Sequence, residues 1–511
     1  MLRTTFRFGR LSIALVVCIL VTSCQLAPAP AAPAKRVLRI GLQGYPDSFN
    51  VNLDHNAPGF TMYRMLFDKL TNADVRNGGK IGPELATSWT LINDTTWEFK
   101  LRNDVKWSDG SPFTADDVVA TIDLTVNGQP PALMASRIEG VTDAVAVDPT
   151  TVDIHTKAKN AILPIGLADI FMYQAKQIKA GGNTAIQQNP VVTGMFKVAG
   201  REEGVSITLD ANPNYWGTKP GVDQVVFRPF PEDATRVAAL ENGEIDIAYT
   251  LPPDDAQRLQ GKGFGVASVS IGQTMVLNLK SVNESTPLFK KEVRQALNYA
   301  IDKDGIVRDT MLGFGKALPG QLVGSDGVGF NSQLQAYPYD LAKAKQMLAQ
   351  AGYPNGFPVT LYTSQGRYVK QKEVSEVIAG QLRAAGLDVT TNLQEFGTFF
   401  VGEPNYDVYY AGWNYFPTMD ADFVLQQFAC SSRFKFMCNQ QFDSLMQQER
   451  QEPDTAKRSA ILQQMETIVH DEAPAIFLFQ APDIFGVAPS VKGYTPTPDD
   501  IIHVDGVTVG A

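Results

Sequence analysis

Short predicted strands alternate with predicted helices along most of the chain, and this alternation restricts the fold more than any other feature. The strands are runs rich in β-branched and aromatic residues between turn residues. They cover residues 37–41, 96–101, 152–155, 205–209, 225–228, 274–279, 359–362, 406–413 and 476–479. Strands interleaved with helices are typical of α/β architectures with mixed sheets. The pattern therefore predicts an α/β fold.

The predicted helices carry recognisable stop signals and apolar faces. The segment 340–351 runs into Gly352, with Pro354 just beyond, which is how many helices end. In the segment from Thr455 on, apolar residues recur at helical spacing. The other predicted helices cover residues 235–242, 291–300 and 373–385.

The N-terminus has the pattern of an export signal. Arg3, Arg7 and Arg10 precede an apolar run at 11–21, which is too short to span a bilayer. The run ends in Val-Thr-Ser-Cys24, which resembles the lipobox of bacterial lipoproteins. The resemblance implies that 1–23 is a lipoprotein signal peptide, that Cys24 is lipidated, and that the Pro/Ala-rich 24–35 is a tether. An ordinary cleaved signal with an incidental cysteine is the alternative.

The rest of the chain agrees with a location outside the cytoplasm, in the periplasm or at the cell surface. No later segment has 18 consecutive apolar residues. Cys430 and Cys438 are eight positions apart, and in an oxidising compartment they predict a disulfide, with a two-cysteine metal site as the alternative. The net charge of −10 argues against a nucleic-acid partner.

Several motifs then identify a family. Residues 83–89 (PELATSW), 96–102 (TWEFKLR) and 105–118 (VKWSDGSPFTADDV) follow one another with little departure from its signature. Further matches keep the same order and cover residues 189–196, 212–216, 240–247, 293–302 and 344–357. Together they resemble the peptide/nickel type of bacterial extracellular solute-binding proteins, family 5.

The resemblance implies a two-lobed periplasmic-binding-protein type II fold (cluster C) with an extra inserted domain. One lobe would combine 36–80, 190–271 and 477–511, the inserted domain would cover 81–189, and the second lobe would cover 272–476. A solute would bind in the cleft between the lobes, and closure would follow from its contacts with both. The implied partners are the permease subunits of an ABC importer and, through the lipid anchor, a membrane; the protein is expected to be a monomer.

The segment 409–423 resembles the cleft-lining stretch of the second lobe. In peptide-binding members an Asp three residues after Trp413 anchors the ligand's α-amino group, and here Phe416 takes that place unless Asp420 or Asp422 substitutes. The aromatic residues could stack on a peptide, a sugar or another aromatic-stacking ligand, or could simply be core residues of a buried strand. The predicted ligand contacts are Trp413, Tyr415, Phe416, Tyr410 and Asp420 on this lobe, and Tyr45, Asp47 and Phe49 in the turn after the first strand of the other. A surface turn is the alternative for the last three.

No cofactor and no metal site are expected. The four histidines, at 55, 155, 470 and 503, do not stand at ligand spacing from one another. The sequence contains neither Gly-x-Ser-x-Gly nor His-Glu-x-x-His, so it favours a binding protein over an enzyme. A secreted hydrolase, and a solute-sensing or surface-binding lipoprotein that is not coupled to transport, are the competing hypotheses.

Overall fold

The computed structural model describes residues 35–44, 48–53, 57–402 and 405–510. From Arg36 onward the chain forms one compact unit. The predicted signal peptide, the lipidation site Cys24 and most of the tether lie outside the described residues, as do Tyr45 and Asp47.

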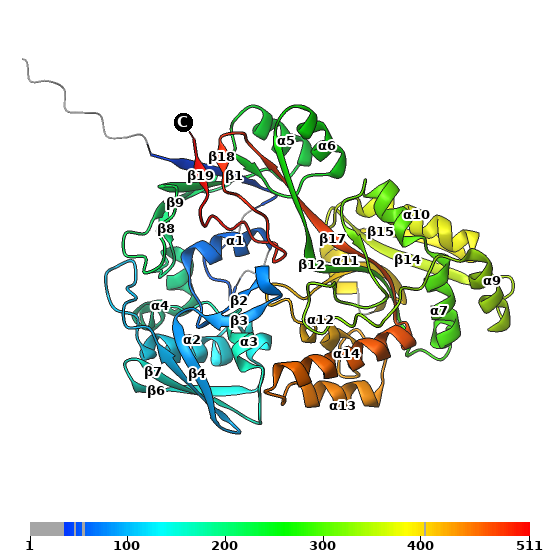
Figure 1. Cartoon of the computed structure of the whole chain (residues 1–511), viewed down its shortest axis with the longest axis horizontal. Coiled ribbons are helices and arrows are strands. Elements are labelled where there is room, and N and C mark those ends of the chain that lie inside the picture. Colours follow the sequence, from blue (N-terminus) through cyan, green and yellow to red (C-terminus); the bar gives the residue numbers. More distant parts are fainter. Residues whose placement is uncertain (1–34, 45–47, 54–56, 403–404, 511) are drawn as a thin grey trace, which may run out of the picture. The chain divides into compact units, whose positions relative to one another are not determined.

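One large mixed sheet runs through this unit (Figure 1). Ten of its eleven strands follow the order β15-β14-β16-β12-β17-β11-β1-β10-β9-β8, and β13 pairs with β17. Neighbours β1, β10 and β11 are parallel, as are β14, β15 and β16 where they pair. The strands are β1 (Val37–Leu42), β8 (Phe196–Glu202), β9 (Ser206–Ala211), β10 (Gln224–Pro229), β11 (Ile247–Ala248), β12 (Gly265–Leu279), β13 (Lys316–Ala317), β14 (Pro358–Gln365), β15 (Asp388–Glu395), β16 (Val408–Asn414) and β17 (Ala475–Val487).

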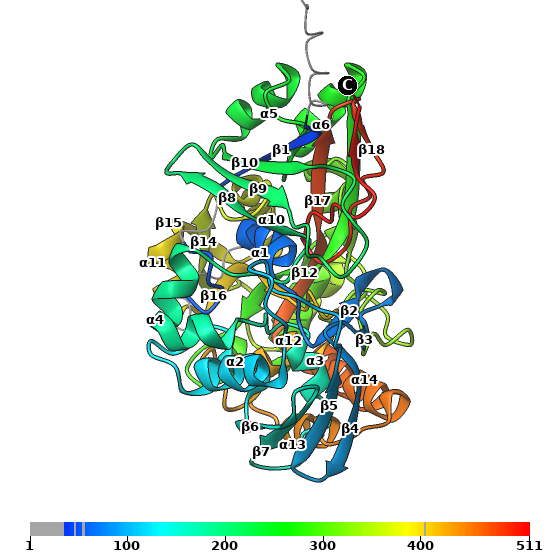
Figure 2. The ribbon, with the colours of Figure 1, turned by 90° about the vertical axis from the view of Figure 1, so that its left-hand side faces the viewer.

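The two longest strands, β12 and β17, connect the two halves of the sheet. They run antiparallel and side by side in both views (Figures 1 and 2). Their pairing is interrupted between Ser270 and Thr274, opposite the stretch between Pro482 and Gln480. We call the half with β1 and β8–β11 the first lobe and the half with β13–β16 the second lobe. The interruption gives a natural bending point between them.

Each lobe has its own helices. In the first lobe, α5 (Asp233–Glu241) and α6 (Pro253–Gly261) pack with β17 around Ile245, Leu251 and Ile484. In the second lobe, two hydrophobic clusters fill the two faces of the sheet. The helices of that lobe are α7 (Lys291–Ala300), α8 (Lys303–Gly305), α9 (Leu341–Gln350), α10 (Gln371–Ala384), α11 (Phe396–Gly402), α12 (Asp422–Leu425), α13 (Gln440–Glu449) and α14 (Thr455–Glu472).

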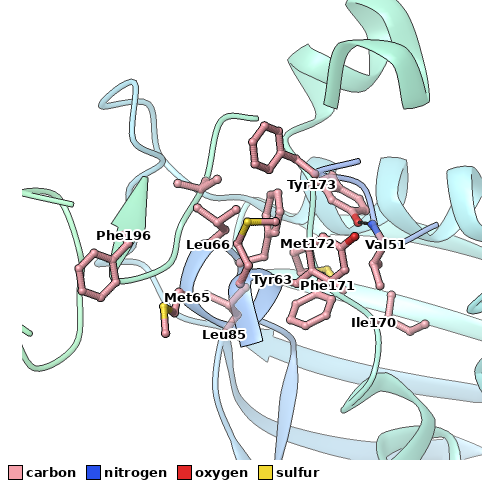
Figure 3. Packing of buried hydrophobic residues seen from close by; sticks show 14 of the residues in the cluster. Val51, Tyr63, Met65, Leu66, Leu85, Ile170, Phe171, Met172, Tyr173 and Phe196 are labelled. Carbon is pink, nitrogen blue, oxygen red and sulfur yellow. Dashed lines mark hydrogen bonds between the residues drawn. The ribbon is translucent and has the colours of Figure 1, made fainter. Parts of the chain in front are cut away.

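A separate four-stranded antiparallel sheet, in the order β4-β5-β7-β6, is built from residues between β3 and β8. Its hydrophobic core is continuous with that of the first lobe: Leu85, Phe171 and Tyr173 pack against Tyr63 of α1 (Figure 3). The Tyr173 hydroxyl accepts a hydrogen bond from the Val51 amide at 3.2 Å. The remaining elements are α1 (Ala57–Leu66), β2 (Thr71–Asp74), β3 (Lys80–Pro83), β4 (Ala86–Asn93), β5 (Thr96–Leu101), α2 (Ala115–Asn127), β6 (Val141–Asp148), β7 (Thr151–Thr156), α3 (Leu163–Leu167), α4 (Ala175–Gln188), β18 (Val491–Lys492) and β19 (Thr508–Val509).

The predicted α/β class is confirmed, and several predicted elements coincide with observed ones. The predictions at 96–101 and 291–300 match β5 and α7 residue for residue. The largest differences are β12 and β17, of which the sequence predicted only the second-lobe portions. The first-lobe part of β12, Gly265–Ile271, contains two serines and one glycine among its apolar residues, so its composition is not typical of a strand.

Cys430 and Cys438 form a disulfide, as the sequence predicts. In the part of the chain that the structure covers, no helix is long and apolar enough to cross a membrane. The same residues contain no group of three or more His, Cys, Asp or Glu side chains that could hold a metal ion.

A candidate ligand-binding cleft between the two lobes

A cavity of about 780 Å³ lies between the first and second lobes. It is lined by residues that directly follow β1, β10 and β11 in the first lobe and β14 in the second. All four strands take part in parallel pairs. Ligands of open α/β sheets bind outside the carboxyl ends of such strands, and the volume is typical of small-molecule sites. The cavity is therefore the candidate ligand-binding cleft.

The first-lobe wall contains a pair of buried carboxyl groups. Asp483 comes from β17 and Asp500 from the segment before β19; they are 4% and 7% exposed, and both line the cleft. The two carboxyl groups are close enough for each to shift the pKa of the other. The hydroxyl of Tyr249, which follows β11, donates a hydrogen bond to Oδ1 of Asp500. Oδ2 of Asp483 is buried and has no hydrogen-bond partner among the described residues.

This environment favours a shared proton. Burial raises the pKa of Asp483 well above its usual range, and Asp500 raises it further. Burial also raises the pKa of Asp500, although hydrogen bonds with Asp483 and Tyr249 and the charge of Arg367 oppose that increase. Two carboxyl groups in contact share a proton rather than both ionise, so the pair carries about one negative charge. The other titratable groups that act on it are Asp499, which accepts a hydrogen bond from His503, and Tyr494.

Three residues that line the cleft have a left-handed backbone. Thr250, Lys370 and Asp500 have φ of 52°, 52° and 59°. A non-glycine residue in this region is uncommon, and for a β-branched threonine it is strained. Such strain persists only where the surroundings hold the backbone in place, and it gathers at functional sites.

A buried arginine holds the Thr250 loop. Arg236 of α5 is fully buried and donates hydrogen bonds to the carbonyl oxygens of Phe230 at 2.8 Å and Thr250 at 2.6 Å. It also forms an ion pair with Asp233 at the start of α5. The loops that follow β10 and β11 are thus connected through one guanidinium group, which fixes this side of the cleft.

The second-lobe wall is a loop, residues 366–370, folded around a buried glutamine. Oε1 of Gln371 accepts hydrogen bonds from the backbone amides of Arg367 at 3.2 Å and Tyr368 at 3.1 Å. Its Nε2 donates to the hydroxyls of Ser364 at 2.7 Å and Thr363 at 3.2 Å. Gln371 therefore ties the loop to the end of β14.

This loop carries a cation and an aromatic ring into the cleft. Arg367 is exposed, and within the described part of the chain its guanidinium has no ion pair or hydrogen bond to a side chain. It lies 5.4 Å from the ring of Tyr368, which meets Tyr410 of β16 edge to face at 6.1 Å. Tyr410 is fully buried, and its hydroxyl has no hydrogen-bond partner among the described residues.

One ion pair already crosses the cleft. Nζ of Lys370, at the start of α10, contacts Oδ2 of Asp254 in the first turn of α6. The amino end of α10 faces the same cavity, with Lys372 and Glu373 in its wall. A helix amino end attracts negative charge, as do Arg367 and Lys370. The second-lobe wall is thus suited to an anionic group, whereas the first-lobe wall is acidic.

A buried polar network lies at the bending point of β12 and β17. Gln480 donates to the Ile271 carbonyl at 2.9 Å and to the Tyr415 hydroxyl at 2.9 Å. The Tyr415 hydroxyl also donates to Asp326 and accepts from the Gly324 amide, each at 3.0 Å. Tyr415, a predicted ligand contact, therefore lies beneath the bending point and supports it.

Of the predicted ligand contacts that the structure describes, only Tyr410 lines the cleft. Trp413 is half-buried in an aromatic cluster with Phe434 and Phe436, and its Nε1 donates to Asn278 at 3.0 Å. Phe416 is half-buried against both hydrophobic clusters of the second lobe. The buried-strand alternative accounts for these positions, because successive side chains of a strand point to opposite faces.

Asp420 and Phe49 lie away from the cleft. Asp420 is 2% exposed and forms a two-pronged ion pair with Arg458 at 2.6 and 2.8 Å. Phe49 is 3% exposed and has Arg201 over its ring at 5.7 Å. These contacts explain why both side chains are buried in the fold.

The cleft residues Tyr249, Arg367, Asp483 and Asp500 were not predicted from the sequence. Arg367 follows a predicted strand and a glycine. Parallel sheets bind ligands at this position after a strand, so the position of Arg367 is the signal that could have identified it. Asp483 lies in the half of β17 that was not predicted, and Asp500 follows no predicted strand. No pattern in the sequence indicated that these two aspartates are buried.

Two lobes joined by two crossing strands, with a cleft between them, define the class of bilobal solute-binding proteins. The profile of the bacterial extracellular solute-binding proteins, family 5 (middle region) matches residues 80–436. The chain belongs to this family, and the predicted family and two-lobed fold are confirmed.

Relatives of the chain bind several kinds of solute. The dipeptide-binding protein of Escherichia coli K12 is 28% identical, with 91% of this chain and 93% of that protein covered. Heme-binding protein A of Haemophilus influenzae is also 28% identical, with 84% of each covered. The solved structure of AgaA from Agrobacterium tumefaciens with agropinic acid has a TM-score of 0.78 at 26% identity and covers 93% of this chain and 99% of that one. The Helicobacter pylori protein DppA with the peptide STSA gives 0.78 at 24% identity, over the same shares of the two chains. Members of the family are binding proteins for small solutes.

Proposed function

We propose that this protein captures a short peptide with a free carboxylate in the interlobe cleft and delivers it to an ABC importer. The observation that carries the proposal is the second-lobe wall: among the described residues no anionic side chain binds Arg367, which projects from a loop that Gln371 holds in place. A guanidinium group is the side chain best suited to two-pronged binding of a carboxylate.

The rest of the cleft supports a peptide over a sugar. Charged groups of both signs face one cavity, with acids on the first lobe and Arg367 and Lys370 on the second. Tyr368, which packs edge to face on the buried Tyr410, offers ring surface for one side chain. Relatives that bind a dipeptide, glutathione and the peptide STSA are consistent with this ligand class.

Closure of the lobes would couple capture to delivery. A peptide that touches Arg367 and the first-lobe wall binds the closed state better than the open one, and this difference shifts the population. The ion pair between Lys370 and Asp254 forms across the cleft and favours the same state. In this proposal the protein is held outside the cytoplasm by lipid on Cys24 and reaches the permease subunits there.

A thermal-shift screen of the full-length chain, purified in detergent, tests the ligand class. Pools of di- to pentapeptides should raise the melting temperature, because a ligand at 100 times its Kd adds about 2.7 kcal/mol of stability. Pools of the same peptides with C-terminal amides should raise it less, and oligosaccharides not at all. Stabilisation by oligosaccharides alone would contradict the proposal. Uptake of a stabilising peptide by cells with and without the protein then separates import from sensing.

A further inference from the structure

The acidic wall of the cleft points to the opposite end of the ligand. We propose that the Asp483–Asp500 pair of the first lobe binds the ligand's ammonium group. This inference rests on the proposed function, since it assigns the second end of a peptide whose carboxylate binds Arg367.

Among the described residues, the charge of the acid pair is uncompensated. No Lys, Arg or His among the described residues forms an ion pair with Asp483 or Asp500, although both line the cavity and are over nine-tenths buried. One oxygen of Asp483 has no hydrogen-bond partner in the part of the chain that the structure describes. A buried negative charge without a cation is costly. A ligand ammonium supplies both the missing charge and three hydrogen-bond donors.

Four other candidate acids already form ion pairs. The predicted substitutes for an amino-group anchor in the second lobe already have cations and do not line the cleft: Asp420 pairs with Arg458, and Asp422 pairs with Arg450 at 2.9 Å. Within the cleft, Asp254 pairs with Lys370 and Asp233 with Arg236. Within the described segments, the first-lobe pair is thus a buried acidic group of the cleft that forms no ion pair.

The surrounding residues hold the acid pair in place. Tyr249 donates a hydrogen bond to Asp500, whose backbone is fixed with φ of 59°. The segment just before it is connected to the bending point, because the Gly272 amide donates to the Pro498 carbonyl at 2.8 Å. A cation bound to Asp500 therefore contacts a segment that is hydrogen-bonded to the bending point between the lobes.

The pair also lies opposite Arg367. All three residues line the same cavity, with Asp483 and Asp500 on the first-lobe wall and Arg367 on the loop of the second-lobe wall. A peptide with a free amino and a free carboxyl end matches both. With the ammonium on the first lobe and the carboxylate on the second, the ligand joins the lobes through its own two charges.

The experiment compares two libraries on the full-length chain in detergent by native mass spectrometry: pooled di- and tripeptides with free amino ends, and the same pools N-acetylated. The wild type should retain the free-amine pool and bind the acetylated pool about 10- to 100-fold more weakly, as expected for the loss of a charged hydrogen-bonded contact. Asp500→Asn and Asp483→Asn should remove most of this preference while binding acetylated peptides like the wild type. Asparagine tolerates the left-handed backbone at 500, so the fold should be kept.

Glu232→Gln is the matched control, because it neutralises an exposed acid on the same wall and should keep the preference. If the wild type binds both pools equally, or if both Asp variants keep the preference for free amines, the ammonium site is wrong and the peptide proposal stands. If neither pool binds, the proposed function itself fails. Should a variant not fold, the comparison of the two pools on the wild type still decides.

Discussion

The two walls of the cleft differ in where their charge is kept. The first-lobe wall buries its key acids, and Asp483 and Asp500 are surrounded by tyrosines and by strained backbone. The second-lobe wall exposes its cation on a loop that a single glutamine holds in place. Buried acids are fixed in position but cost stability, whereas an exposed arginine costs little and can follow the ligand. This contrast suggests that the first lobe sets the position of the ligand and that the second lobe closes on it.

Replacing the exposed cation should have the largest effect on binding. Arg367→Gln should weaken binding of a carboxylate peptide by about 10- to 100-fold, the usual contribution of a charged hydrogen bond. Isothermal titration of the wild type and the variant measures this. Lys372→Gln, which removes another exposed cation of the same wall, should change the affinity little. Equal losses of affinity in the two variants would mean that binding depends on the overall electrostatic potential of the wall and not on a specific contact with Arg367.

Neutralising one buried acid should stabilise the ligand-free protein. The folded state raises the pKa of Asp483, so the stability it contributes is complete below the pKa of an unfolded Asp and is lost as pH rises through the folded pKa. Asp483→Asn should therefore be more stable than the wild type at pH 8, by about 1–3 kcal/mol, the usual cost of an unpartnered buried polar group.

Thermal unfolding at pH 4 and pH 8 measures that gap, which should shrink at pH 4, because the raised pKa of Asp483 favours its protonated form at lower pH. Glu232→Gln serves as control and should show the same difference from the wild type at both values. A variant that is less stable than the wild type at pH 8 would show that the acid pair supports the fold rather than the ligand.

The buried hydroxyl of the second-lobe wall should contribute less. Tyr410→Phe removes a hydroxyl without a partner among the described residues, so the ligand-free melting temperature should stay equal or rise. Peptide binding should weaken by about 3- to 10-fold if that hydroxyl bonds the ligand. Tyr409→Phe, on the opposite face of β16, is the control and should not change the affinity. Unchanged affinity in Tyr410→Phe would restrict the residue to packing.

The ion pair across the cleft should have a small effect. Asp254 is 60% exposed at its side chain, and exposed pairs contribute about 0.2–1 kcal/mol. A double-mutant cycle with Lys370→Gln and Asp254→Asn should give a coupling in peptide affinity of about fivefold at most, which should fall as salt rises. A coupling that is insensitive to salt would contradict the assignment to an exposed pair.

The sequence predicted the fold better than the site, and single elements explain why. The helix at 291–300 was recovered because its apolar face repeats at helical spacing, and β5 because it alternates between turns. The first half of β12 and the second half of β17 belong to the first lobe. Their pairing partners lie far away in the chain, and local patterns do not indicate such pairing. The family motifs predicted the two lobes, because these motifs are tied to the fold of the family and not to its ligand.

The site was predicted only in part, because aromatic density is a signal of burial as much as of binding. Strand β16 has tyrosines on both faces: Tyr410 reaches the cleft and Tyr409 the opposite core. Asp483 and Asp500 are 17 positions apart and become a pair only through the return of the chain after β17, which no local spacing indicates.

The last prediction concerns Trp413, the residue that the sequence favoured most as a ligand contact. Its indole donates to Asn278 and packs on Phe434 and Phe436, outside the cleft lining. Trp413→Phe should therefore lower the stability of the fold by about 1–3 kcal/mol, since Asn278 loses a partner in a buried site. Peptide affinity should stay within about twofold of the wild type, as expected for a site without shared contacts. The opposite result would be an unchanged melting temperature with binding weakened more than tenfold. It would show that the ligand contacts the 413–416 segment. The contrast between the two walls would then no longer describe how this protein binds its solute.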